Sequence, residues 1–198
     1  MPFQIHPSFS EVIDSYDGFI LDQFGVLHNG SRGLEGAPEL VSELAKRGKK
    51  LIILSNSSSA SESTRAKLPK LGFDPNDFCG AVTSGEEAAR HIAGEFTGKR
   101  AVFFTWKTPK TPSPMTFLEL CGGIDVVGDP SEADFVILHG VDVLRGPGSD
   151  GEAEETPLGG FNQEGKFDAI DPVLRKCADA NLPMVWAEDP RLELKMFL

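Results

Sequence analysis

An aspartate between an apolar run and a glycine-containing turn is the residue best suited to chemistry. Residues 18–21 are short and apolar, Asp22 ends this run abruptly, and Gly25 follows soon after. A buried parallel strand delivers an acid in this way to the carboxyl edge of a sheet, where α/β proteins bind ligands. Asp22 could act there as a nucleophile, a metal ligand, or both. The alternative is a strand and turn in which Asp22 only caps local amides.

A second polar group follows the next apolar run. Apolar residues recur at helical spacing over 37–45, and Leu51–Leu54 then predicts a buried strand that ends on Ser55 and Asn56. Strand, helix and strand in this order predict a right-handed parallel crossover. Both strands would then end at the same edge of one sheet. We therefore expect Asp22, Ser55 and Asn56 to lie close together.

The run from Ser55 to Ser59 consists of small hydroxyl and amide side chains between a strand and a helix. Such a run offers side-chain donors and unpaired helix amides to an anion. The alternative is a solvated loop in which Ser59 and Glu62 form a capping box for a helix over 60–71. With Asp22 at the same edge, the sequence favours phosphate binding.

The remainder of the chain continues the alternation of strands and helices, so the predicted fold class is α/β throughout. One long segment, 145–166, is rich in glycine and acidic residues and predicts an exposed loop. A short helix is also expected near 10–16. The further predicted strands are 81–83, 100–105, 124–127, 134–138 and 183–187, and the further helices are 84–96 (with Ser84 and Glu87 as a capping box), 114–121 and 170–178.

Composition narrows the classes of partner. The net charge of 19 minus 30, or -11, argues against a nucleic-acid partner. No apolar run has the length of a membrane span, and the first residues lack a secretory signal. Three widely spaced cysteines indicate reduced thiols in a cytoplasmic protein, with Cys79 and Cys121 expected to be buried.

The motifs and their order resemble the haloacid dehalogenase superfamily. Asp22 followed by Gly25-Val26-Leu27 resembles motif I, and Leu54-Ser55-Asn56 resembles motif II. The form is similar to the class IIA, nitrophenylphosphatase-like hydrolases, whose link into the cap resembles Thr83–Glu86 and whose cap resembles 129–136. The resemblance implies a partial Rossmann-like core with a parallel sheet at residues 1–84. It also implies an inserted α/β cap domain at residues 85–198.

This resemblance implies a phosphatase that uses magnesium. Asp22 would be the nucleophile that forms an aspartyl-phosphate, while the Ser55 hydroxyl and the Asn56 backbone amide would hold the phosphoryl oxygens. Mg2+ would bridge Asp22 and the phosphate, with the Phe24 backbone carbonyl as a further ligand. The expected substrate is a small phosphorylated metabolite, and a homodimer through the cap would fit the family.

Two departures from the family pattern lead to an alternative. Phe24 stands where a second aspartate usually serves as general acid and base, a function that contributes roughly 10²- to 10⁴-fold. The family's later lysine and Gly-Asp-x-x-x-Asp element have no counterpart before Leu198, and Lys195 is expected to be solvated. We therefore expect a truncated chain that lacks the C-terminal part of the core. The alternative function is an impaired or inactive fragment that acts by binding.

Two further interpretations are weaker. His28 could reach a bound phosphate, although a histidine in such a turn is more often a surface residue or a local hydrogen-bond partner. A phospho-accepting receiver domain also places an aspartate at a strand end. That fold has no place for a large α/β insertion after the second motif.

Overall fold

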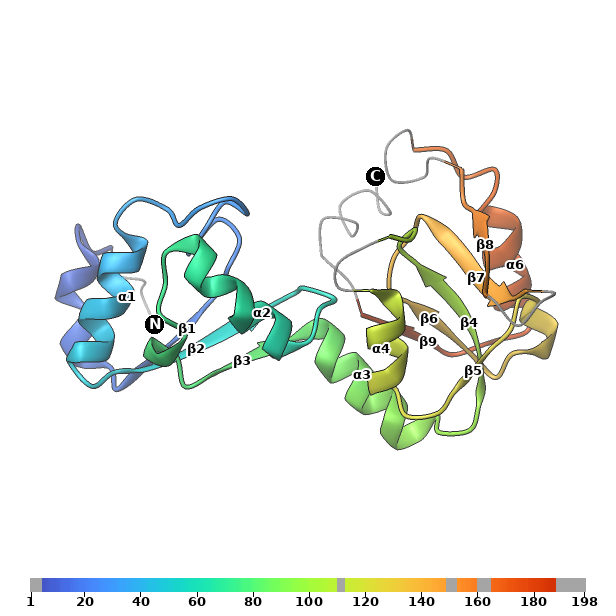
Figure 1. Cartoon of the computed structure of the whole chain (residues 1–198), viewed down its shortest axis with the longest axis horizontal. Helices are drawn as coiled ribbons and strands as arrows, with labels where there is room; N and C mark the ends of the chain where they lie inside the picture. The colour runs from blue at the N-terminus through green and yellow to red at the C-terminus, as the bar shows by residue number, and fades with distance from the viewer. Residues whose placement is uncertain (1–4, 110–112, 149–152, 160–164, 188–198) are drawn as a thin grey trace. The chain divides into compact units, whose positions relative to one another are not determined.

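The computed structural model describes residues 5–109, 113–148, 153–159 and 165–187. The chain divides into two compact units (Figure 1): the first contains Met1–Ser55 and Ser61–Val82, and the second contains Asn56–Ala60 and Thr83–Leu198. Both units contain parallel strands and helices, so the predicted α/β class is confirmed. The assignment of residues 1–84 to a core and 85–198 to a cap stays a prediction.

The first unit is a sheet of three strands in the order β1-β2-β3. Strand β1 and strand β2 are parallel, with Leu21 opposite Ile53, and helix α1 connects them, as the sequence predicts. After β2 the chain forms α2 and a short 3-10 helix. The bounds are β1 Gly18–Leu21, α1 Ala37–Lys46, β2 Lys50–Ser55, α2 Ser61–Lys67, the 3-10 helix Leu68–Leu71 and β3 Gly80–Thr83. Where the sequence predicts one helix near 10–16, the chain forms two 3-10 helices, Phe9–Glu11 and Ile13–Ser15. A further 3-10 helix, Pro75–Asp77, precedes β3.

The core of the first unit lies on one face of this sheet. Leu51 and Ile53 of β2 are fully buried and belong to one cluster with Val41 and Leu44 of α1. Side chains alternate between the faces of a strand, and Ile20 of β1 is 70% exposed. Parallel sheets are normally covered on both faces. Within the described residues, the second face of this sheet is therefore apolar but open.

The sheet of the second unit combines parallel and antiparallel pairing. Its order is β8-β7-β4-β6-β9, with β5 paired to the start of β4. Strand β4 is parallel to β5 and β6, β6 is parallel to β9, and the β7–β8 hairpin is antiparallel. The bounds are β4 Arg100–Thr105, β5 Asp125–Val126, β6 Phe135–Leu138, β7 Val143–Pro147, β8 Ala153–Pro157 and β9 Met184–Trp186. A short 3-10 helix, Pro130–Glu132, precedes β6.

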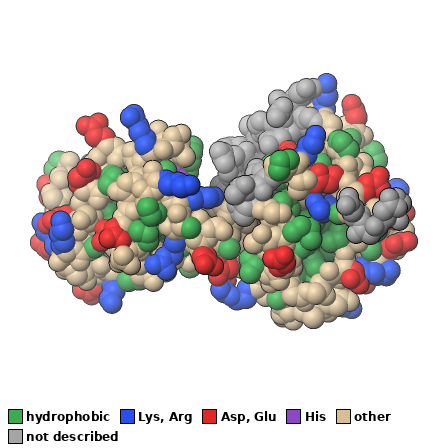
Figure 2. All heavy atoms as spheres, in the orientation of Figure 1, with side chains coloured by type: hydrophobic (Ala, Val, Ile, Leu, Met, Phe, Trp, Pro, Cys, Tyr) green, Lys and Arg blue, Asp and Glu red, His purple; other side chains and the backbone are tan. Residues whose placement is uncertain are grey.

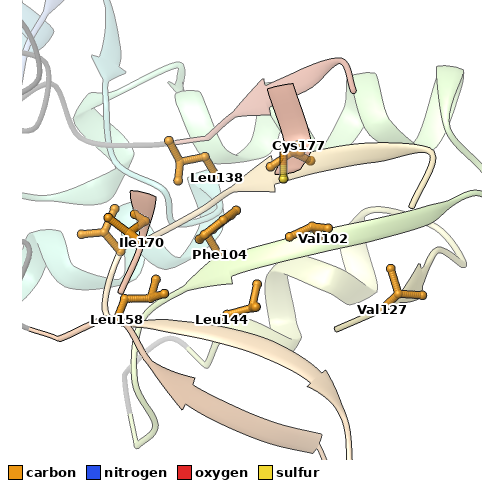
Figure 3. Close-up of a cluster of buried hydrophobic side chains, with 10 residues drawn as sticks. Val102, Phe104, Val127, Leu138, Leu144, Leu158, Ile170 and Cys177 are labelled. Atoms are coloured by element: carbon orange, nitrogen blue, oxygen red, sulfur yellow. The ribbon is translucent and has the colours of Figure 1, made fainter. Parts of the chain in front are cut away.

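Helices cover both faces of this second sheet. Phe103 of β4 clusters with residues of α3 (Ser84–Glu95) and α4 (Pro114–Leu120). Its neighbours Val102 and Phe104 cluster instead with Ile170 and Cys177 at α6 (Asp171–Asp179), as Figure 3 shows. The alternation along β4 thus builds two hydrophobic cores, one on each face.

The prediction of a long exposed loop over 145–166 is wrong in its first part, where β7 and β8 form a hairpin. The Arg145 Nη1 atom donates to the Glu155 Oε1 atom at 2.8 Å, and the Thr108 Oγ1 atom donates to the same oxygen at 2.8 Å. Acidic composition indicated a solvated loop, but Glu155 is paired with Arg145 on the neighbouring strand and with Thr108, which is distant in sequence.

Two smaller predictions also need correction. The side chain of Thr83, not that of Ser84, caps α3, because its Oγ1 atom accepts from the Glu86 N–H at 3.3 Å. Cys79 is exposed, whereas Cys121 is buried as expected. Lys195 and Leu198 lie outside the described residues. Among the helices of the described part, none is long and apolar enough to cross a membrane.

Charged side chains of both signs are interspersed over the described surface. Figure 2 shows acidic and basic groups on each unit, with apolar side chains between them. The overall excess of acid gives the net charge of -11. A uniformly basic surface, the footprint of nucleic-acid binding, is not seen in this view.

Candidate active site

Asp22 and Ser55 lie at the ends of neighbouring parallel strands. Asp22 directly follows Leu21, the last residue of β1, and Ser55 is the last residue of β2. Because Leu21 is in register with Ile53, both polar residues reach the carboxyl edge of the sheet. Asp22 is exposed, while Ser55 is only 8% exposed. The crossover predicted from the sequence therefore places these two residues as expected, and their chemical roles stay predictions.

Asn56 follows Ser55 but starts a segment that packs with the second unit. The Gly85 N–H of α3 donates to the Ser57 carbonyl at 3.0 Å. A Cβ atom at Gly85 would lie 2.1 Å from the Ser58 carbonyl oxygen, so only glycine allows this approach. Asn56 itself is exposed. The serine loop is thus held against the start of α3, a contact that the sequence did not predict.

Backbone hydrogen bonds fix the turn that follows Asp22. The Gln23 carbonyl accepts from the Leu27 N–H at 2.8 Å and from the His28 N–H at 3.0 Å. The Gln23 N–H donates to the Asp22 Oδ1 atom at 2.7 Å. Gly25, at φ 84°, occupies the left-handed region that glycine adopts without strain. This turn therefore holds one oxygen of the Asp22 carboxylate in a charge-assisted hydrogen bond.

Apolar surface lies within the same turn. Phe24 is 57% exposed and Val26 is 50% exposed. The Phe24 ring meets the His28 ring edge to face, with centroids 6.4 Å apart and an interplanar angle of 86°. The side chain two residues after Asp22 is thus a large ring open to solvent.

His28 is partly buried and neutral in the arrangement observed. Its Nδ1 atom accepts a hydrogen bond from the Gly30 N–H at 3.0 Å, so that nitrogen carries no proton. Burial lowers the pKa of His28, the negative charge of Asp22 opposes this shift, and the positive charge of Lys67 adds to it. The histidine therefore lies in the electrostatic field of Asp22, as expected for a residue of this turn.

Lys67 is a basic neighbour that the sequence did not reveal. His28 forms an isolated bridge with Gly33, and the Gly33 N–H donates to the Leu71 carbonyl at 2.9 Å. Lys67 lies one helical turn before Leu71, which explains why its charge reaches His28. No sequence signal could have found it, because the contact joins segments far apart in the chain.

Within the described residues, few groups near Asp22 could bind a metal ion. No three His, Cys, Asp or Glu side chains of the described ranges gather in a metal-binding group. The exposed Asp22 carboxylate and the backbone carbonyl of Phe24 lie two residues apart at the strand end. Mg2+ is usually held by one or two carboxylates together with water and substrate phosphate. The donors fit an ion that takes most of its remaining ligands from water and a bound phosphate.

Comparison with known proteins finds a match to one family model. Residues 19–111, which include Asp22 and Ser55, match the family model described as haloacid dehalogenase-like hydrolase. This segment, just under half of the chain, is similar to the haloacid dehalogenase-like hydrolases. This match confirms the resemblance drawn from motifs I and II.

The chain is also similar to curated proteins from animals and plants. It is similar to human chronophin, with 31% identity over 133 residues, covering 63% of this chain and 42% of chronophin. Bovine chronophin is 39% identical over 127 residues, covering 62% and 41% of the two chains. The Arabidopsis thaliana phosphoglycolate phosphatase 1A is 35% identical over 68 residues, covering 34% and 19%. The chain thus spans less than half the length of these relatives.

Solved structures support the fold. A haloacid dehalogenase-like hydrolase from Brucella suis superposes with a TM-score of 0.65 at 22% identity, covering 93% of this chain and 58% of that one. A p-nitrophenyl phosphatase from Archaeoglobus fulgidus gives a TM-score of 0.51 at 22% identity, covering 86% and 54%. At these identities the likeness shows a shared fold and no more.

Proposed function

We propose that this chain is a class IIA, nitrophenylphosphatase-like phosphatase that hydrolyses a phosphate ester through an aspartyl-phosphate on Asp22. The observation that carries the proposal is the placement of Asp22 and Ser55 at the carboxyl ends of adjacent parallel strands. Parallel sheets bind ligands at this edge. The family match over residues 19–111 includes both positions.

The proposed reaction has two steps. An oxygen of the Asp22 carboxylate attacks phosphorus, the bond from phosphorus to the ester oxygen breaks, and its electron pair leaves with that oxygen. The hydrogen bond from the Gln23 N–H holds the Asp22 Oδ1 atom in place during the attack. Water then attacks the aspartyl-phosphate, releases phosphate and restores the carboxylate.

Ser55 and Asn56 are the proposed phosphate-binding residues. Ser55 is nearly buried at the strand end, where a hydroxyl can donate to a phosphoryl oxygen. In this proposal the Asn56 backbone amide donates to a second oxygen. These donors would stabilise the charge that develops on the phosphoryl group.

The proposed cofactor is Mg2+. Asp22 and the Phe24 carbonyl would hold it, and the bound ion would supply positive charge beside the phosphoryl oxygens. The proposed substrate is a small phosphorylated metabolite, and the proposed setting is cytoplasmic with a homodimer through the second unit. The structure of the Mycobacterium tuberculosis glycerol phosphate phosphatase in complex with magnesium, with a TM-score of 0.50 at 18% identity, concerns that protein and supports the fold alone.

A second candidate is a protein that binds phosphate without turnover. One observation favours it: the side chain two residues after Asp22 is the exposed ring of Phe24, which cannot transfer a proton. A binding protein would keep the Asp22–Ser55 edge for recognition alone.

Hydrolysis of 4-nitrophenyl phosphate by the chain tests the proposal. We expect turnover with Mg2+, its loss on chelation, and a loss of at least about 10³-fold in Asp22→Asn, because the nucleophile is removed. Asp17→Asn is the matched control, since Asp17 is an exposed carboxylate just before β1. Unchanged turnover in Asp22→Asn would contradict the proposal.

The same protein samples distinguish the phosphatase from the phosphate-binding protein without turnover. If the wild-type chain shows no turnover but inorganic phosphate raises its Tm, the binding function is supported. If phosphate raises Tm and 4-nitrophenyl phosphate is hydrolysed, the phosphatase is supported.

A further inference from the structure

The turn that follows Asp22 contains an asparagine directly before a glycine. Asn29-Gly30 is the one Asn-Gly pair of the sequence, and both residues are exposed. A backbone nitrogen can attack the side-chain amide of the asparagine before it and close an imide ring, with loss of ammonia. Glycine favours this closure because it has no Cβ atom to crowd the ring.

The backbone of the turn holds the Asn29 side chain in a defined position. The Ser31 N–H and the Arg32 N–H both donate to the Asn29 Oδ1 atom, each at 3.0 Å. The ring that the Ser31 hydrogen bond closes also contains the Asn29 Cγ atom and the Gly30 nitrogen. The side-chain carbonyl is thus folded back toward the nitrogen that would attack it, which lowers the entropic cost of ring closure.

The same two N–H groups face the atom on which charge would develop. Attack at the Asn29 Cγ atom moves an electron pair of the carbonyl bond onto Oδ1. Two backbone donors already aimed at that oxygen stabilise the oxyanion, as in the oxyanion holes of acyl-transfer enzymes. In an unfolded chain the same oxygen has water in place of these fixed donors.

The attacking nitrogen is fixed as well. The Gly30 N–H donates to the His28 Nδ1 atom at 3.0 Å, and the Asn29 N–H donates to the Arg32 carbonyl at 3.1 Å. Gly30 has a φ of 92°, which glycine adopts without strain. Both atoms of the new bond are therefore held within one ordered turn.

We propose that Asn29 is a site of spontaneous deamidation and that the fold of this turn accelerates the reaction. The exposed Gly30 nitrogen gives its proton to a hydroxide ion of the solvent and bonds to the Asn29 Cγ atom. The bond from Cγ to Nδ2 then breaks, and ammonia leaves with a proton taken from water. Water opens the imide at either of its two carbonyl carbons and leaves aspartate or isoaspartate at position 29.

The two products change the turn in different ways. The carboxylate of aspartate still accepts from the Ser31 and Arg32 N–H groups, now as charge-assisted hydrogen bonds. Isoaspartate instead adds a methylene to the backbone between positions 29 and 30, which displaces the N–H groups that donate to Arg32 and His28. We therefore expect isoaspartate to lower Tm, and the Asn29→Asp variant to keep the Tm of the fresh wild-type chain.

Ageing of the intact chain in mildly alkaline buffer tests the inference. Peptide mapping by mass spectrometry follows the replacement of amide by acid in the folded chain and in the same chain kept unfolded in urea. We expect position 29 to react several-fold faster in the folded chain, because only the folded turn has the two fixed donors. Asn181 is the internal control, since it is also exposed but precedes Leu182, whose side chain hinders ring closure.

The Asn29→Gln variant is the matched control for the reaction itself. It keeps the carboxamide but would have to close a larger ring, so position 29 should stay unmodified. Deamidation at position 29 that is faster in the folded chain and absent from Asn29→Gln supports the inference.

A rate in the folded chain equal to or below the rate in the unfolded chain would overturn the inference, as would equal deamidation of Asn181. An aged chain that contains isoaspartate but keeps its Tm would overturn the effect on the turn. Mass and Tm are measured here, so these outcomes do not depend on whether the chain hydrolyses phosphate esters.

Discussion

Asp22 and Ser55 reach the same sheet edge with different surroundings. Asp22 is exposed and held by the backbone of its own turn, through the Gln23 N–H. Ser55 is nearly buried as the last residue of β2. A nucleophile needs access to its substrate, whereas a phosphate ligand gains from a fixed position. The two environments suit the roles proposed for them.

Substitution of Ser55 should weaken catalysis without removing it. We expect Ser55→Ala to lower kcat/KM for 4-nitrophenyl phosphate roughly 10- to 100-fold, because a hydrogen bond to a charged group is worth about 1.5–3 kcal/mol. Ser15→Ala, an exposed serine of the first unit, is the control. Equal kinetics for the two variants would exclude Ser55 from phosphate binding.

Thiol reactivity should separate the three cysteines. Burial raises the pKa of Cys121 to about 12 and also raises that of Cys177, so both stay protonated at pH 8. Cys79 is exposed. A disulfide reagent at pH 8 should therefore label one thiol rapidly in the folded chain and all three after denaturation.

The Cys79→Ser variant serves as the control for this experiment, because it should lose the rapid phase. Rapid labelling of more than one thiol in the native wild-type chain would show that Cys121 or Cys177 is accessible, against the burial found here.

At the scale of elements, two glycines of α3 differ in the space available for a Cβ atom. Gly85 accommodates the Ser58 carbonyl so closely that a Cβ would lie 2.1 Å from it, whereas a Cβ at Gly94 would meet nothing within 4 Å. We expect Gly85→Ala to lower the free energy of unfolding by about 1–3 kcal/mol, as overpacking does. Gly94→Ala should raise it by about 0.5–1 kcal/mol.

Denaturant unfolding of both variants measures this contrast. The matched pair keeps the helix and the substitution constant and contrasts a glycine in contact with the serine loop with one that has no contact there. A Gly85→Ala variant as stable as Gly94→Ala would show that the loop of 56–60 is not held against α3.

Regular elements were predictable where one local pattern dominated. The apolar runs before Asp22 and Ser55 predicted β1 and β2, and the crossover rule then placed both residues at one edge. Composition does not predict the β7–β8 hairpin, because it does not reveal that Glu155 pairs with Arg145 and Thr108. Lys67 was missed for a related reason, since it approaches His28 only through tertiary packing.

At the scale of the whole molecule, the chain contains two units and covers only part of its relatives. The family match covers residues 19–111, so it begins within β1 and includes β2, β3 and β4. On that sheet the face bearing Ile20 and Leu54 is exposed within the described residues. The proposed chemistry depends instead on the polar carboxyl edge of the same sheet. Asp22 and Ser55 lie there, at the ends of β1 and β2.

The central claim is that Asp22 becomes covalently phosphorylated. The most direct measurement is rapid acid quenching of the chain during turnover of 4-nitrophenyl phosphate with Mg2+, followed by mass spectrometry of the peptide that contains Asp22. We predict a peptide heavier by one phosphoryl group, with the modification on Asp22 and absent from Asp22→Asn. Turnover with an unmodified Asp22 peptide, or with the phosphoryl group on another residue, would contradict the account.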